Sequence, residues 1–201
     1  MARRDINLKF DNKKKIIDVK IVFYGPALSG KTTTLKYLFQ KFGKLDKIKS
    51  INTTTGRTLF FDFGIIKLKG IEWDVKFLIY STTGKDYYAI TRPTTLQGAD
   101  GIIFVADSFV ESFNRNLVSW RELASLYGEK LLKMPIVCNF NKQDLLRKFN
   151  FYEFLEKIFF EKYKSFAFFK TIALLGDGVV NSFKKIIELI FPGLVINQIS
   201  I

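Results

Sequence analysis

The sequence predicts an α/β domain in which a mostly parallel, six-stranded sheet carries one antiparallel edge hairpin and has helices on both faces. Two observations predict this class. Runs of β-branched and aromatic residues alternate along the chain with segments whose apolar residues recur at helical spacing. A glycine-rich loop also joins the first strand-like run to the first helix-like segment. With 201 residues, 48% of them hydrophobic, the chain is long enough for one well-packed core.

The strand-like and helix-like segments follow one another in a regular order. The first run, Ile16–Tyr24, is rich in β-branched residues and suits a buried strand. The next segment, 31–42, carries leucine and phenylalanine at helical spacing. We expect strands near residues 16–24, 58–68, 71–80, 100–106, 135–140 and 166–172. We expect helices near residues 31–42, 88–97, 113–131, 151–163 and 179–191.

The second and third strands are the exception to the parallel arrangement. Only Lys69 and Gly70 separate the runs 58–68 and 71–80, so these two should pair as an antiparallel hairpin at the edge of the sheet. Because helices separate most of the other strands, those strands should lie parallel to one another. In such open sheets the ligand binds beyond the carboxyl ends of the strands.

The chain should fold as one domain with a short segment at each end. We expect a flexible basic arm over residues 1–15, a single domain over 16–192 and a short tail over 193–201. The first residues lack the apolar stretch of a signal peptide, and no apolar run is long enough to predict a transmembrane helix. The single cysteine, Cys138, has no partner for an internal disulfide. These features predict a cytoplasmic protein with a buried, structural thiol.

The formal charge of +13 admits two interpretations. One is attraction to anions such as nucleotides, acidic lipids or an acidic partner. The other is a lysine-rich composition spread over a solvated surface, which the scattered positions of the lysines favour. No basic–aromatic recognition motif predicts binding to nucleic acid. Peripheral contact with a membrane stays open, although no lipidation motif supports it.

Residues 25–32 read Gly-Pro-Ala-Leu-Ser-Gly-Lys-Thr and match the phosphate-binding pattern G-x-x-x-x-G-K-T in full. In such a loop, successive backbone N–H groups point inward at the α- and β-phosphates of a nucleotide. We expect Lys31 to lie along the β- and γ-phosphates and the hydroxyl of Thr32 to ligate Mg²⁺, while the following helix directs its positive end at the anion. The candidate phosphate-binding residues are Gly25, Ala27, Leu28, Ser29, Gly30, Lys31, Thr32 and Thr33.

A second motif, Asn-Lys-Gln-Asp, occupies residues 141–144 directly after a strand-like run and matches the guanine-reading pattern N-K-x-D. The carboxylate of Asp144 can accept two hydrogen bonds from the N1–H and amino group of guanine, whereas adenine lacks this pair of donors. ATP is therefore a weak rival as ligand. We expect the stem of Lys142 to lie along the base, Asn141 to connect this loop to the phosphate-binding loop, and Ala173 to donate its N–H to the guanine oxygen. The order of elements and motifs is that of a Ras-like P-loop G domain.

Several stretches carry a family resemblance: the phosphate-binding loop, Gly56–Phe63, Tyr80–Gly84, Gly101–Ser108 and the Asn-Lys-Gln-Asp motif. Together they resemble the MglA family, the Ras-like GTPases of bacterial cell polarity and gliding motility. The resemblance runs from about residue 16 to about residue 191 and is most specific around Arg57–Phe63. It implies a bacterial molecular switch that binds GTP or GDP with Mg²⁺ and hydrolyses GTP.

The resemblance also implies roles for two switch segments, at about 45–58 and 82–95. Thr58 would contact Mg²⁺, as a metal ligand beside Thr32, and the γ-phosphate of GTP. Arg57 would serve as an internal arginine finger, with a solvated loop arginine as the alternative. Gly84 would donate its N–H to the γ-phosphate, so that the second switch senses hydrolysis. An effector would read the switches, and the activator would be a roadblock-domain protein resembling MglB.

Three residues depart from the usual Ras-like pattern. Ser81 stands where most Ras-like proteins have the aspartate that supports Mg²⁺, although the MglA family itself usually has threonine there. Lys85 replaces the glutamine that orients the attacking water, and a protonated lysine cannot accept a proton. Ala27 adds a methyl group at a position that is often glycine. The carboxylate of Asp62, one strand away, is interpreted as structural.

These departures predict a GTPase with slow or partner-dependent hydrolysis. The expected catalytic set comprises Arg57, Thr58, Gly84 and Lys85. The alternative is a GTP-binding scaffold module with little or no hydrolysis.

Overall fold

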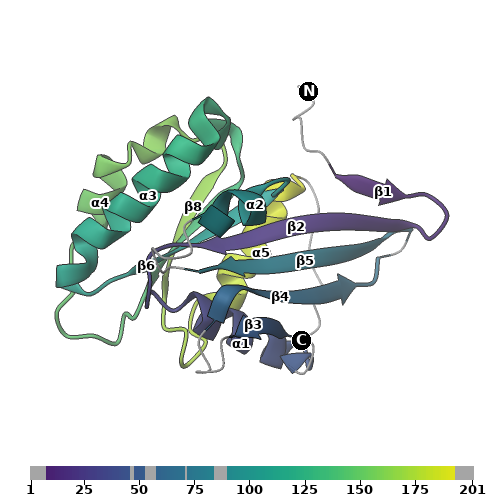
Figure 1. Cartoon of the computed structure of the whole chain (residues 1–201), viewed down its shortest axis with the longest axis horizontal. Helices are drawn as coiled ribbons and strands as arrows, with labels where there is room; N and C mark the ends of the chain where they lie inside the picture. The colour runs from purple at the N-terminus through teal and green to yellow at the C-terminus, as the bar shows by residue number, and fades with distance from the viewer. Residues whose placement is uncertain (1–7, 46–47, 53–57, 71, 84–89, 193–201) are drawn as a thin grey trace.

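The computed structural model describes residues 8–45, 48–52, 58–70, 72–83 and 90–192. One twisted sheet runs through the molecule with helices on both faces, which confirms the predicted α/β class (Figure 1). The strands are β1 (Lys9–Asp11), β2 (Ile16–Tyr24), β3 (Lys49–Asn52), β4 (Thr58–Leu68), β5 (Asp74–Thr82), β6 (Gly101–Asp107), β7 (Ile136–Asn141) and β8 (Phe166–Thr171). The α-helices are α1 (Lys31–Lys41), α2 (Arg92–Leu96), α3 (Phe113–Tyr127), α4 (Phe151–Lys157) and α5 (Val179–Ile190).

The strands of the sheet lie in the order β3-β4-β5-β2-β6-β7-β8, and β1 pairs with β2 beside this path. Strands β5, β2, β6, β7 and β8 are parallel, as expected for strands joined by helices. The predicted hairpin is confirmed, because β4 pairs antiparallel with β5 and places Asp62 opposite Ser81. The described residues form eight strands, two more than the predicted six, because β1 and β3 were not foreseen.

Strand β1 lies within the segment that was expected to be a flexible arm. Strand β6 pairs with β2 only over Ile21–Tyr24, so the first half of that edge of β2 is left open. Residues Lys9–Asp11 pair antiparallel with Ile16–Asp18 on this open edge. Leu8 to Asp11 alternate apolar and polar, but so short a run is a weak strand signal, and the pairing comes from the free backbone groups of β2.

Two apolar cores lie on opposite faces of the sheet. Helices α1 and α5 cover one face, where Phe39 and Phe183 are buried against the sheet. Helices α2, α3 and α4 cover the other face through Leu96, Trp120 and Phe154. This double covering explains why the central strands β6 and β7 are buried along their whole length.

Two of the long helices end earlier than their apolar pattern predicted. Helix α3 ends at Tyr127, because Gly128 adopts a φ of 57° that leaves the helical region. Helix α4 ends at Lys157, and Phe159 takes a left-handed φ of 54°. Short 3₁₀ helices, Gly128–Lys133 (η4) and Phe160–Lys162 (η5), follow these ends; η4 buries Leu131, whereas Phe160 of η5 is only partly buried.

Candidate nucleotide-binding site

The motifs found in the sequence meet at the carboxyl edge of the parallel strands. Strand β2 ends in the phosphate-binding loop, and the parallel register brings Asp107, Asn141 and Thr171 level at the ends of β6, β7 and β8. Segments that are more than a hundred residues apart in the sequence therefore lie side by side at one edge. This is the edge at which open α/β sheets bind ligands.

The two glycines of the phosphate-binding loop meet strict steric limits. Gly25 has a φ of 139°, and an added Cβ would come within 2.3 Å of the carbonyl oxygen of Val105. Gly30 has a φ of 101°, and a Cβ there would lie 2.2 Å from Nδ2 of Asn141. Leu28 also has a left-handed φ of 62° and exposes 78% of its surface. Such strained backbone in a non-glycine residue is typical of functional loops.

Lys31 is buried inside this loop. Its Nζ donates to the carbonyl oxygens of Gly25 at 2.8 Å and Pro26 at 2.7 Å. Burial, and then the nearby guanidinium of Arg92, lower the pKa of Lys31 to about 7, while the carboxylate of Asp62 raises it. A phosphate placed in the loop would favour the charged lysine, because it supplies the opposite charge that the buried site lacks.

The hydroxyl of Thr32 donates a hydrogen bond to Oδ2 of Asp62 at 2.7 Å. Asp62 lies on β4 and is only 1% exposed, directly opposite Ser81 of β5. The hairpin register therefore brings a buried carboxylate next to the position where the usual metal-supporting aspartate is missing. The sequence alone favours a structural role for Asp62, because its place beside Thr32 depends on pairing between strands and not on a contiguous motif.

These residues fit a magnesium ion. A hydroxyl and a carboxylate are hard oxygen ligands, which Mg²⁺ prefers. Within the described ranges no group of three or more His, Cys, Asp or Glu side chains gathers at a metal-binding distance. A site built from one or two protein oxygens plus substrate phosphates is the usual arrangement for Mg²⁺ in nucleotide-binding proteins.

Asn141 ties three loops together. Its Nδ2 donates to the carbonyl oxygen of Ser29 at 2.8 Å, which joins the base-reading loop to the phosphate-binding loop. Its Oδ1 accepts from the Thr171 hydroxyl at 3.2 Å and from the Ala173 N–H at 2.9 Å. The N–H of Ala173, expected on the guanine oxygen, is thus directed at Asn141 here. The side chain of Asn141 is buried, so these bonds are protected from water.

Lys142 is held by a carboxylate that the sequence analysis missed. Its Nζ lies 2.8 Å from Oδ2 of Asp107, whose side chain is 3% exposed. Arg115 approaches the same oxygen at 3.6 Å but is half exposed. Lys142 itself has a left-handed φ of 67°, while Asp144 is exposed at the rim of the site. The ion pair therefore fixes the direction of the Lys142 stem.

The structure leaves part of the expected catalytic set undescribed. Arg57, Gly84 and Lys85 lie outside the described residues, and the side chain of Thr58 does too, although its backbone begins β4. Ala27 and Thr33 are partly buried in and beside the phosphate-binding loop. The described residues therefore include the candidates for contact with phosphate, base and metal, and leave out most of the expected catalytic set.

A buried polar network lies behind the loop. Arg92 is 7% exposed, donates from Nε to the carbonyl oxygen of Thr83 at 3.1 Å, and pairs with Glu122 of α3. Burial and the Glu122 carboxylate raise the pKa of Tyr24, the last residue of β2. No motif in the sequence indicates this network, which links the end of β5 to α2 and α3.

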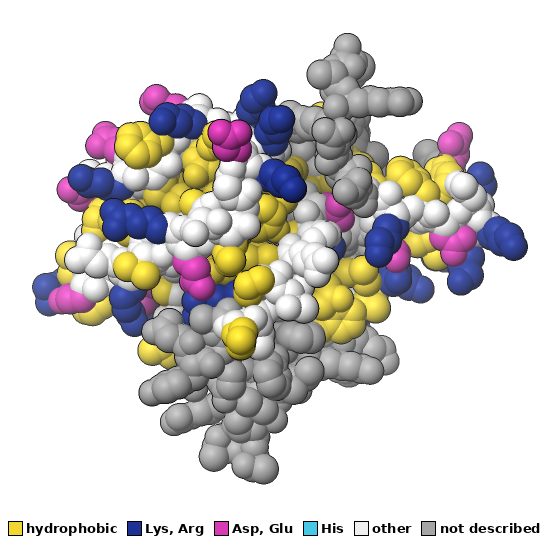
Figure 2. Space-filling model, turned by 45° about the horizontal axis from the view of Figure 1, so that its top comes forward, with side chains coloured by type: hydrophobic (Ala, Val, Ile, Leu, Met, Phe, Trp, Pro, Cys, Tyr) yellow, Lys and Arg dark blue, Asp and Glu magenta, His cyan; other side chains and the backbone are white. Residues whose placement is uncertain are grey.

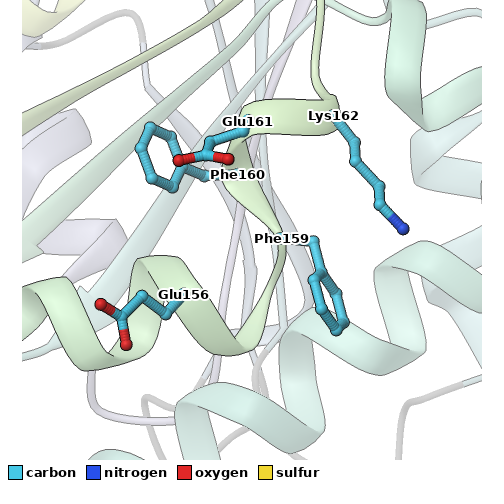
Figure 3. Close-up of a pocket in the computed structure, with 5 residues that line it drawn as sticks. All are labelled: Glu156, Phe159, Phe160, Glu161 and Lys162. Carbon is cyan, nitrogen blue, oxygen red and sulfur yellow. The ribbon is translucent and has the colours of Figure 1, made fainter.

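A pocket away from the candidate nucleotide site lies between α4 and η5 and is shown in Figure 3. It is lined by Glu156, Phe159, Phe160, Glu161 and Lys162. The ammonium of Lys162 lies 4.8 Å from the centre of the Phe159 ring. Two carboxylates against one ammonium give no net positive charge for phosphate, so this pocket is separate from the nucleotide chemistry.

The sheet order, the glycine-rich loop and the base-reading loop together define a small GTPase of the Ras-like class. A family model described as the ADP-ribosylation factor family matches residues 6–190, and the chain belongs to this family of small GTPases. The sequence is 35% identical over 184 residues to mutual gliding-motility protein MglA of Myxococcus xanthus (strain DK1622), covering 89% of this chain and 93% of that protein. The resemblance to MglA predicted from the sequence is confirmed.

Proposed function

We propose that this chain is a Mg²⁺-dependent guanine-nucleotide switch that hydrolyses GTP slowly until a partner assists. The observation that carries the proposal is the double tie of Asn141 to Ser29 and Ala173. It fixes the base-reading loop to the phosphate-binding loop, so that Asp144 and Lys31 can bind opposite ends of one nucleotide. This arrangement supports guanine nucleotides as the ligand, because only guanine offers the donor pair that satisfies Asp144.

Competition between nucleotides tests this specificity. We expect GDP and GTP to displace a fluorescent GDP analogue, and ATP to do so only at concentrations roughly 10⁴-fold higher. Asp144→Asn should lower the affinity for GDP and raise that for the xanthine nucleotide, whose C2 oxygen accepts from the new amide. Equal displacement by ATP and GTP would show that the loop does not read guanine.

Three oxygens would hold the metal: the hydroxyls of Thr32 and Thr58, and the carboxylate of Asp62. The short bond between Thr32 and Asp62 supports this set, and Asp62 would compensate for the absence of an aspartate at Ser81. Bound Mg²⁺ supplies charge neutralisation for the β- and γ-phosphates. The protein residues position these oxygens and exclude water from the buried carboxylate.

Slow hydrolysis follows from the residues near the γ-phosphate. The side-chain oxygen of glutamine accepts a hydrogen bond from the attacking water and so orients it, whereas a protonated Lys85 has no acceptor. The methyl group of Ala27 would crowd the same region. Arg57 would stabilise the developing charge once a partner positions it. Gly84 would sense the γ-phosphate through its N–H.

Single-turnover hydrolysis of bound GTP separates a slow switch from a scaffold. We expect the wild type to hydrolyse GTP slowly and Lys85→Gln to raise the rate by about tenfold or more. A roadblock-domain activator should also raise the wild-type rate, and Arg57→Ala should abolish this activation. No hydrolysis with or without activator would favour the GTP-loaded scaffold. A fast wild type that Lys85→Gln slows would show that the lysine is catalytic.

We also propose a role in bacterial cell polarity or gliding motility, in the cytoplasm, with an effector that reads the switch segments. The name of the relative in Myxococcus xanthus, mutual gliding-motility protein, supports this role. None of the helices in the described part of the chain has the length and hydropathy that a bilayer crossing requires. Deletion of the gene followed by tracking of single cells tests the proposal, which predicts lost or disordered movement.

A further inference from the structure

Two turns lie side by side at the end of the sheet farthest from the nucleotide site. One joins β1 to β2 and the other joins β4 to β5, and the backbone N–H of Asp74 donates to the carbonyl oxygen of Lys15 at 2.8 Å. Because β6 reaches only the second half of β2, this end of the sheet projects beyond the helices (Figure 1). We call this projection the lysine tip and define it by Lys9–Lys15, Lys67, Lys69 and Trp73.

The charge of the lysine tip is concentrated and mostly positive. The exposed acidic side chains at the tip are Asp11, which lies 3.7 Å from Lys14, and the neighbouring Glu72. Figure 2 shows several basic side chains on this projection with hydrophobic surface between them. The exposed cations of the tip are Lys9, Lys13, Lys14, Lys15, Lys67 and Lys69.

Two aromatic side chains sit among these lysines. Phe10 is 57% exposed and meets Trp73 edge to face, with ring centres 5.9 Å apart. The ammonium of Lys15 lies 4.8 Å from the centre of the Trp73 ring. Aromatic rings beside flexible ammonium groups suit the headgroup region of a bilayer, where the rings enter the boundary and the cations meet phosphates.

We propose that the lysine tip is a docking surface for an anionic lipid membrane. Its cations are all lysines, and a lysine acts as a point charge toward a diffuse negative surface, whereas planar recognition of single phosphates favours arginine. Lys15 covers a face of Trp73, so that face is not a free platform for stacking nucleic-acid bases. Each lysine near an anionic surface adds to the attraction, and six of them outweigh two acids.

The position of the tip fits this role. Strand β2 spans nine residues, or about 30 Å, between the tip and the phosphate-binding loop. A membrane that contacts the tip therefore leaves the opposite edge of the sheet open to nucleotides and proteins. The docking surface does not depend on nucleotide binding, because no residue of the tip belongs to the site.

Vesicle co-sedimentation tests the proposal. We expect the full chain to bind vesicles of phosphatidylcholine with phosphatidylglycerol, not phosphatidylcholine alone, and to lose binding as salt rises. Replacing Lys13, Lys14 and Lys15 with glutamine should lower the partition coefficient about tenfold or more, and Phe10→Ala should lower it further. Brominated lipid should quench Trp73, because Trp120 is only 3% exposed in the core.

A matched triple variant separates the tip from net charge. Lys130, Lys133 and Lys157 are exposed on η4 and α4, and their replacement by glutamine removes the same charge. We expect this variant to bind vesicles as the wild type does, and both variants to retain a fluorescent GDP analogue. Three results would each overturn the proposal. The two triple variants could lose vesicle binding equally, the wild type could fail to bind anionic vesicles, or the tip could bind an oligonucleotide in place of vesicles.

Discussion

Asp62 places a carboxylate beside the phosphate-binding loop. Its carboxylate is buried and accepts the hydroxyl hydrogen of Thr32 at 2.7 Å. Asp62→Asn removes the charge and keeps the size, so the affinity for GDP at a fixed Mg²⁺ concentration should fall by roughly 10- to 100-fold. Titration of GDP binding with Mg²⁺ measures this loss.

Ser81 provides the control, because it lies opposite Asp62 at the position that usually supports the metal. Ser81→Ala should change the Mg²⁺ dependence by less than about threefold. A larger effect of Ser81→Ala, or an unchanged Mg²⁺ titration in Asp62→Asn, would show that Asp62 does not support the metal.

Asp107 holds the ammonium of Lys142 at 2.8 Å and would act on a bound base through that side chain. In Asp107→Asn the amide can still accept from the N–H of Phe109, but the charge that fixes Lys142 is lost. We expect GDP to dissociate about tenfold faster, since removing one partner of a buried pair costs about 1–3 kcal/mol. Stopped-flow release of a fluorescent GDP analogue measures this rate.

Arg115→Gln is the matched control for Asp107. Arg115 contacts the same carboxylate from the surface at 3.6 Å, and such pairs contribute less than about 1 kcal/mol. Its dissociation rate should stay close to that of the wild type. A rate that rises equally in both variants would show that general electrostatics, and not the hold on Lys142, retain the nucleotide.

At the scale of single elements, strand β7 links the core to the base-reading loop. Every residue of β7 is buried, including Cys138, the only cysteine of the chain. Burial raises the pKa of the Cys138 thiol, so the thiolate that reacts with disulfide reagents is suppressed. The predicted burial of this thiol is therefore confirmed.

Reaction of Cys138 reports on the opening of β7. We expect the folded protein to react with an aromatic disulfide reagent at least about 10³-fold more slowly than the urea-unfolded chain. Saturating GDP should slow the reaction further, because a ligand that binds the folded form stabilises it. Rapid labelling under native conditions would contradict the burial of this strand.

Across the whole molecule, the sequence predicted the features that lie within short contiguous segments. The run from Ile16 through Thr32 contains strand, loop and helix start in one piece, and the Asn-Lys-Gln-Asp motif follows a buried strand. The hairpin was predictable because only Lys69 and Gly70 separate the two strand-like runs of the sequence, although β5 itself begins later, at Asp74. The fold class and the location of the candidate nucleotide-binding site were predicted from these contiguous segments.

Features that depend on distant pairing were not predictable. Asp62 reaches Thr32 only through the position of β4 beside β5, and Asp107 meets Lys142 only because β6 and β7 are in register. Strand β1 forms because β6 leaves part of β2 unpaired, which no local pattern of Lys9–Asp11 reveals. Arg57, Gly84 and Lys85 stay predictions, since they lie outside the described residues.

We propose above that this molecule binds guanine nucleotides at the edge formed by the phosphate-binding and base-reading loops. The most direct test is the nucleotide content of the gently purified protein, released by denaturation in the presence of Mg²⁺ and separated by chromatography. We expect GDP or GTP close to one equivalent per chain in the wild type, and much less in Asp144→Ala. Adenine nucleotides in place of guanine, or a wild type that is empty and binds no added GDP, would contradict it.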